Sequence, residues 1–209
     1  MADTGAEAAR QIKGNGIHIG VLALQGDYAA HASAFERIGV QTELVKKAEQ
    51  FENIDGLVLP GGESTTMLKF LEQRHLFASL ERFVKAKPCF ATCAGCILLA
   101  NEVLHPKQRS LGALDATVER NAYGRQIDSS ILTLPTELTG GPLEMVFIRA
   151  PRITRVGAGV EVLARRDGFP TLVRQSHLLA ATFHPEMSGD TRIQELFLDI
   201  IRQHKTAAS

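Results

Sequence analysis

The segment Phe90-Ala91-Thr92-Cys93-Ala94-Gly95 joins an apolar, strand-like run to a helical one. A nucleophile flanked by small residues at such a junction lies in a sharp turn, above the edge of a sheet and at the N-terminus of a helix. An unassisted thiol is mostly protonated at pH 7, so a working Cys93 needs both that helix end and a nearby base. The segment predicts a nucleophilic cysteine on an α/β sheet. A buried structural cysteine is the alternative.

The tripeptide His184-Pro185-Glu186 supplies the missing base. It follows the apolar run Leu178–Phe183, which is typical of a buried strand. Residues two apart in extended chain project to one side, so the Glu186 carboxylate can orient the His184 imidazole that serves the thiol. Cys93, His184 and Glu186 are therefore the predicted nucleophile, base and orienting group.

Length, charge and composition exclude several classes of protein. The 209 residues suit one α/β domain, and the formal net charge of zero predicts no nucleic-acid partner. Apolar stretches stay short of the roughly 20 residues that span a membrane, and the polar start predicts no secretory signal. Three cysteines cannot all pair within one chain, so we expect reduced thiols and a cytoplasmic location.

Strands and helices alternate over the first half of the chain. Strands are predicted at Ile17–Leu24, Val40–Val45, Gly56–Leu59 and Pro88–Thr92, and helices at Tyr28–Ile38 (with Gly39 as C-cap), Ser64–Leu71 and Leu76–Val84. This alternation predicts an open, mostly parallel sheet flanked by helices, a flavodoxin-like α/β fold.

The second half is richer in short β-runs and predicts an antiparallel extension of the sheet. Such runs occur at Ala113–Glu119, Met145–Ile148, Val160–Arg165, Thr171–Arg174 and Leu178–Phe183, before an amphipathic helix at Asp190–His204. We expect residues 1–16 to form a flexible N-terminal lead and residues 17–205 to form one domain.

Two glycines follow a predicted buried strand in Pro60-Gly61-Gly62-Glu63-Ser64-Thr65-Thr66. Backbone N–H groups in such a turn can face a ligand and, with the N–H of Ala94, bind the oxyanion formed when Cys93 attacks a carbonyl. An ordinary strand–helix turn with Ser64 as N-cap is the alternative. Arg120 (before Asn121) and Arg149 each stand at a predicted strand end, where a guanidinium suits a carboxylate, although surface arginines are commoner.

The remaining cysteines and histidines receive no catalytic role. Cys93 and Cys96 form a C-x-x-C pair, and a redox dithiol or a zinc site with Cys89 is a further alternative. Cys89 and Cys96 are more simply core residues, and we predict no metal and no cofactor. Six histidines without a partner pattern are interpreted as structural or solvent-facing: His18, His31, His75, His105, His177 and His204.

Taken together, these motifs resemble those of triad-type (class I) glutamine amidotransferases, and most closely the glutaminase subunit of pyridoxal 5′-phosphate synthase. The resemblance runs from about Ile17 to Lys205. Its motifs are Gly20–Asp27, Pro60–Thr66, Thr92–Gly95, Val118–Gln126, Phe147–Pro151 and Phe183–Glu186.

The resemblance implies hydrolysis of L-glutamine to glutamate and ammonia through a thioester on Cys93. It also implies an oxyanion hole from Gly62 and Ala94, and ammonia delivery to a (β/α)₈ synthase subunit that makes pyridoxal phosphate and activates the glutaminase. The implied substrate-binding residues are Gly62, Glu63, Ser64, Arg120, Ile148 and Arg149.

Two residues depart from the pattern of that family. Ala91 stands where glycine is usual, and Cys96 where an apolar residue such as leucine is usual, so the efficiency of the site is in question more than its identity. Rival hypotheses are a glutaminase of another synthase, such as imidazole-glycerol-phosphate synthase, and a non-catalytic regulatory subunit of the same fold.

Overall fold

A computed structural model describes residues 16–120 and 129–208. The predicted lead over residues 1–15, and Asn121 to Gln126 of the arginine motif, lie outside these ranges. The strands are β1 (His18–Leu22), β2 (Gln41–Val45), β3 (Gly56–Leu59), β4 (Cys89–Thr92), β5 (Ala100–Leu104), β6 (Leu114–Glu119), β7 (Ser129–Leu134), β8 (Leu143–Ile148), β9 (Arg152–Val156), β10 (Glu161–Arg166), β11 (Phe169–Gln175) and β12 (Leu178–Ala181). The helices are α2 (Tyr28–Glu36), α3 (Ser64–Gln73), α4 (Phe77–Ala86), α5 (Ala94–Leu99) and α6 (Arg192–Ala208), with 3₁₀ turns η1 (Ala48–Glu52) and η2 (Pro185–Met187).

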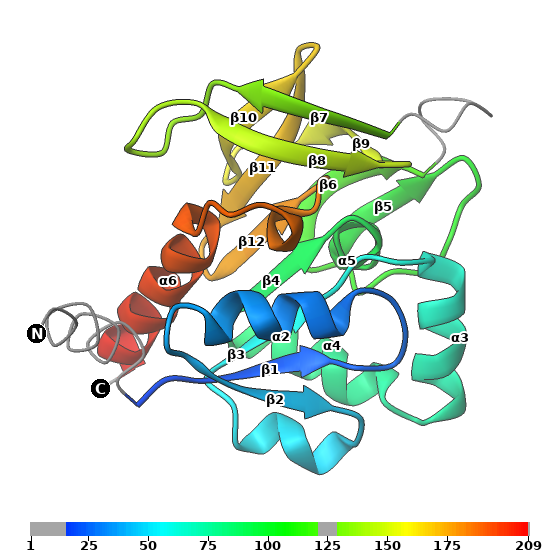
Figure 1. Cartoon of the computed structure of the whole chain (residues 1–209). Helices are drawn as coiled ribbons and strands as arrows, with labels where there is room; N and C mark the ends of the chain where they lie inside the picture. The colour runs from blue at the N-terminus through cyan, green and yellow to red at the C-terminus, as the bar shows by residue number, and fades with distance from the viewer. Residues whose placement is uncertain (1–15, 121–128, 209) are drawn as a thin grey trace, which may run out of the picture.

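Seven strands form the central sheet in the order β10-β11-β12-β4-β3-β1-β2 (Figure 1). Strands β12, β4, β3, β1 and β2 run parallel, whereas β10 and β11 extend the sheet antiparallel to β12. This confirms the predicted fold class. Beyond the antiparallel edge, β5, β6 and β9 form a smaller sheet, and β7 pairs with β8.

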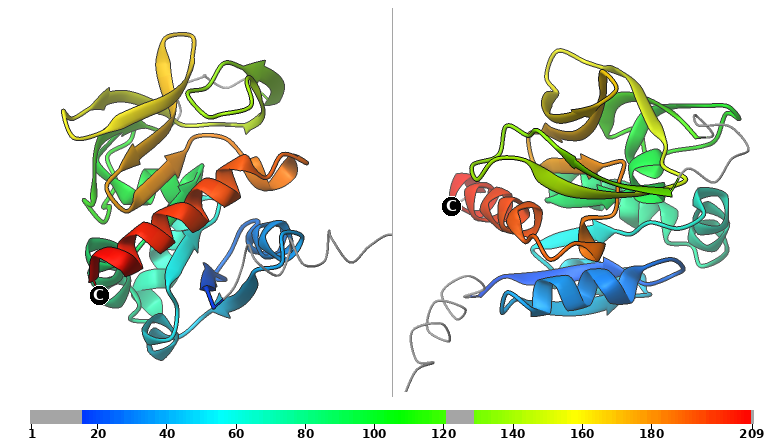
Figure 2. Two further views of the ribbon diagram at one scale, coloured as in Figure 1. Left: turned by 90° about the vertical axis from the view of Figure 1, so that its left-hand side faces the viewer. Right: turned by 45° about the horizontal axis from the view of Figure 1, so that its top comes forward.

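Helices cover both faces of the central sheet because its strands are apolar on both faces. In β3, Leu57 and Leu59 pack into the core beneath α3, α4 and α5, whereas Val58 packs into the core beneath α2 and α6. Two views of the ribbon show α2 and α4 on opposite sides of the strands (Figures 1 and 2). No helix among the described residues is long and apolar enough to cross a membrane.

Several boundaries differ from the prediction. Strands β5, β7 and β9 and the turn η1 were not predicted, and α6 begins two residues later than expected and continues to Ala208. Helix α2 runs to Glu36, with Arg37 as C-cap. Gly39 closes the helix as predicted, because at a φ of +79° its N–H donates to the Glu36 carbonyl while the Val40 N–H donates to the Phe35 carbonyl.

The topology places the predicted chemistry at one edge of the sheet. Because β12, β4, β3 and β1 are parallel neighbours, the segments that follow them all emerge on the same side. Those segments carry His184, Cys93, Gly61 and Asp27, respectively. In open α/β sheets, a crevice at the carboxyl ends of the strands is the usual place for a ligand.

Candidate active site

Cys93 occupies a strained turn between β4 and α5. Its backbone has a φ of +47°, a region that side chains other than glycine rarely adopt, and its N–H donates to the carbonyl of Ala181 over 2.9 Å. Strain of this kind persists where the surrounding structure enforces it, often at functional sites. Gly95 lets α5 start close to the sheet, since a Cβ there would lie 2.2 Å from the carbonyl oxygen of Leu59. Ala91 is an ordinary strand residue paired with Leu59 and Ala180.

His184 links Cys93 to Glu186. Its Nδ1 lies 2.7 Å from Oε1 of Glu186, and its imidazole lies close enough to the Cys93 thiol for the two groups to interact. Because Nδ1 faces the carboxylate, Nε2 is the nitrogen left for the sulfur. The three predicted residues therefore meet, and each is at least 94% buried.

Electrostatics in this group favour a protonated imidazole. Burial lowers the pKa of His184, but the hydrogen bonds with Cys93 and Glu186 outweigh it and raise that pKa to about 10. Burial likewise opposes ionisation of Glu186, yet the bond to His184 and the nearby His31 keep its pKa below the ordinary value. The arrangement is that of an imidazolium held by a carboxylate beside a thiol.

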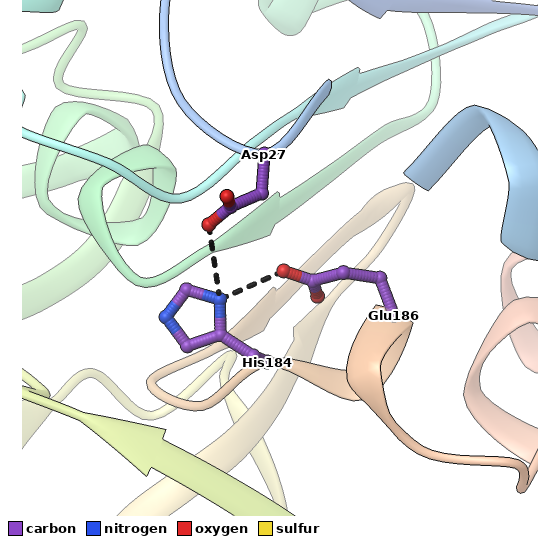
Figure 3. A group of neighbouring side chains, drawn as sticks. All are labelled: Asp27, His184 and Glu186. Atoms are coloured by element: carbon purple, nitrogen blue, oxygen red, sulfur yellow. Dashed lines mark hydrogen bonds and ion pairs between the residues drawn. The ribbon is translucent and has the colours of Figure 1, made fainter. Parts of the chain in front are cut away.

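A second carboxylate, Asp27, approaches the same imidazole from the turn after β1. Its Oδ2 lies 3.8 Å from Nδ1 of His184, and its side chain is 42% exposed, whereas Glu186 approaches from the buried side (Figure 3). Asp27, His184 and Glu186 are the group among the described residues that could hold a metal ion. A metal on Nδ1 would have to displace the proton shared with Glu186, so these residues suit hydrogen bonding better than metal binding.

The two-glycine turn lies directly over the imidazole and the thiol. A Cβ at Gly61 would be 2.5 Å from Cε1 of His184 and 3.4 Å from Cβ of Cys93. Gly62 has a φ of +136°, which only glycine adopts readily. The side-chain amide of Gln25 fixes this turn, because it donates to the carbonyl of Glu63 over 3.1 Å and accepts from the Glu63 N–H over 3.3 Å.

A pocket of about 180 Å³ opens beside the thiol and is lined by groups of both charges. Arg120 is bonded to the Glu63 carboxylate over 3.0 Å, and Arg149, at a φ of +44°, follows β8 and also lines the pocket. The lining residues are Asp27, Gly62, Glu63, Ser64, Cys93, Ile97, Arg120, Ile148, Arg149 and His184. All predicted substrate-binding residues are among them.

Other details correct or extend the sequence analysis. The N-cap of α3 is Glu63, whose carboxylate accepts from the Thr66 N–H, and not Ser64, which is the first helical residue and donates to Gln108. Cys89 and Cys96 are free thiols in the core, and burial raises the pKa of Cys96 to about 12. The sequence analysis gave no site role to Gln25, Asp27, Ile97 and Gln108, and gave His31 no partner there. Gln25 and Asp27 belong to the Gly20–Asp27 motif, but their roles, like those of the others, depend on tertiary contacts.

Fold and site are thus those of an α/β protein equipped for thiol chemistry on a small polar substrate. The sequence model of the SNO glutamine amidotransferase family matches residues 21–203, and the chain belongs to this family.

Relatives agree with this membership. The chain is 60% identical over 184 residues to the protein from Koribacter versatilis (strain Ellin345) named pyridoxal 5′-phosphate synthase subunit PdxT, covering 88% of this chain and 95% of that protein. It is 47% identical over 186 residues to the protein of the same name from Thermotoga maritima. That alignment covers 88% of this chain and 99% of the Thermotoga protein.

Solved structures show the same fold. A crystal structure described as that of a glutamine amidotransferase superimposes with a TM-score of 0.82 at 44% identity, covering 88% of this chain and 98% of that one. A putative GMP synthase subunit from Thermoplasma acidophilum shares the fold, with a TM-score of 0.67 at 16% identity. The superposition covers 92% of this chain and 97% of that one.

Proposed function

We propose that this protein is the glutaminase subunit of a pyridoxal 5′-phosphate synthase, with Cys93, His184 and Glu186 as its catalytic triad. The observation that carries the proposal is that thiol, imidazole and buried carboxylate meet, with Nδ1 of His184 bonded to Glu186 and the Cys93 thiol opening onto a pocket lined by groups of both charges. The names of the relatives at 60% and 47% identity favour this synthase over the alternatives.

The pocket suits the zwitterion of glutamine. The guanidinium groups of Arg120 and Arg149 can bind the α-carboxylate, and the carboxylate of Glu63, which also pairs with Arg120 and caps α3, can accept a further hydrogen bond from the α-ammonium. The side chain of glutamine then extends toward Cys93, where backbone N–H groups of Gly62 and Ala94 form the oxyanion hole.

The reaction proceeds through a thioester. The Cys93 thiolate attacks the side-chain amide carbon, and the C–N bond breaks as His184 donates a proton to the leaving nitrogen, which departs as ammonia. His184, now neutral, takes a proton from water, whose oxygen attacks the thioester. Glutamate leaves, and the thiolate–imidazolium pair is restored. Glu186 keeps the imidazole oriented throughout.

The partner is a (β/α)₈ synthase subunit that receives the ammonia within a complex. The nucleophile must stay reduced, which fits a cytoplasmic location. We place the domain at residues 17–205, a range that agrees with the family match over residues 21–203.

Glutamate release from glutamine by the full chain, with and without the purified synthase subunit, tests the proposal. We expect strong stimulation by that subunit and a loss of at least about 10³-fold in Cys93→Ala. Cys96→Ala is the matched control, because Cys96 lies one helical turn further on and is buried in the core. Stimulation by an imidazole-glycerol-phosphate synthase cyclase instead would refute the assignment of the partner.

A further inference from the structure

His31 lies in α2, fully buried, on the far side of Glu186 from His184. Its Nε2 is 3.3 Å from Oε2 of Glu186 and 3.0 Å from Oγ1 of Thr92, the residue before the nucleophile. Oε1 of Glu186 faces His184, so the two oxygens of one buried carboxylate face two different imidazoles.

The surroundings of His31 determine where its proton sits. Nδ1 has no hydrogen-bond partner in the part of the chain that the structure describes. A lone pair on Nε2 would face a carboxylate oxygen and be repelled by it, whereas an N–H there faces two acceptors. His31 is therefore a donor at Nε2.

The charge of His31 follows from its surroundings. Burial is the main influence and lowers the pKa of His31. The nearby Glu186 carboxylate acts in the opposite direction, and His184 and Asp27 have smaller effects. The edge of the Phe90 ring completes its apolar surroundings. Burial therefore disfavours the imidazolium form of His31, and the N–H at Nε2 is present in the neutral ring as well.

We propose that His31 is a positioning residue that links the orienting carboxylate to the strand carrying the nucleophile. Its Nε2–H group lies against Oε2 of Glu186 and donates to the Thr92 hydroxyl, which fixes the carboxylate relative to Cys93. The functional chain then has four members, His31, Glu186, His184 and Cys93. This inference rests on the proposed glutaminase function.

The test compares three variants in the assembled complex. His31→Leu removes the donor, whereas His31→Gln keeps an N–H near the place of Nε2, and His31→Asn has an amide too short to reach Glu186. We expect His31→Leu to lower kcat about 10- to 100-fold with KM unchanged, because His31 does not line the pocket. His31→Gln should recover most of kcat, and His31→Asn should not.

A pH profile separates positioning from a purely structural role. Without the His31 N–H beside Oε2, Glu186 should protonate at higher pH, so the acid limb of Cys93 alkylation by iodoacetamide should move upward in His31→Leu and return in His31→Gln. Thr92→Val, which removes the other partner of Nε2, should leave the acid limb in place.

Unchanged kcat and pH profile in folded His31→Leu would overturn the inference, as would a change confined to KM. If His31→Leu does not fold, the Gln and Asn variants decide, and equal activity of the two overturns it. Equal glutamate release by Cys93→Ala and the parent would instead overturn the proposed function, whatever the His31 variants do.

Discussion

Replacing Glu186 with glutamine should disable the imidazole while leaving substrate binding intact. The 2.7 Å contact with Nδ1 of His184 is a hydrogen bond to a fully buried charge, and such bonds contribute about 1.5–3 kcal/mol. At about 1.4 kcal/mol for each tenfold change in rate, its loss predicts a fall in kcat of about 10- to 150-fold. An amide that turns its NH₂ toward Nδ1 would also favour the wrong tautomer, which adds to the loss.

The assay is glutamate release by the complex, with kcat and KM measured separately. KM should not change, because Glu186 is not among the residues that line the pocket. Loss of the carboxylate charge should also lower the pKa of His184 from about 10, so that Cys93 alkylation at pH 6 slows. Glu81→Gln is the matched control, since Glu81 forms an exposed ion pair with Lys85 on α4. A kcat within threefold of the parent would refute the reasoning.

Three further predictions concern the turn, the core and the surface. Gly61→Ala should lower kcat about 100-fold without unfolding the protein, because its Cβ would displace the His184 ring; unchanged kinetics would contradict the close approach. Phe197→Ala should lower the free energy of unfolding by about 3–5 kcal/mol in denaturant titrations, since the ring is fully buried; a loss below 1 kcal/mol would contradict that packing. Partial burial opposes ionisation of Asp55, but the hydrogen bonds from Lys205 and from the His18 N–H, with the charges of Lys205 and Lys87, together lower the pKa of Asp55. Asp55→Asn should therefore lower the melting temperature slightly above about pH 4, and the difference should vanish as the pH falls through that lowered pKa; a difference that persists in acid would refute the assignment.

The sequence predicted the parallel sheet and the triad because both have strong local signatures. Apolar runs mark the buried strands on either side of Cys93, and the spacing of His184 and Glu186 marks a base with its orienting group. The other sequence motifs shared with the amidotransferase family also identified the pocket residues that the structure brings together.

The rest depended on contacts that no local pattern records. The charged sequence of β9 and the half-exposed alternation of β7 resemble loops until a partner strand is placed beside them. His31 is a lone histidine in a helix, and its contact with Glu186 arises only when α2 packs against η2. The approach of Asp27 to His184 likewise arises because the parallel strands β1 and β12 end on the same side of the sheet, and not from their spacing in the sequence.

Trapping of the acyl-enzyme is the most direct test of the account. Glutamine is mixed with the complex, the reaction is quenched in acid, and the cysteine-containing peptides are analysed by mass spectrometry. We predict a glutamyl group on Cys93 of the parent protein and none on Cys89 or Cys96. The Cys93→Ala variant should carry no glutamyl group. Turnover at the parent rate with no adduct on Cys93, or with the adduct on another cysteine, would contradict the central claim.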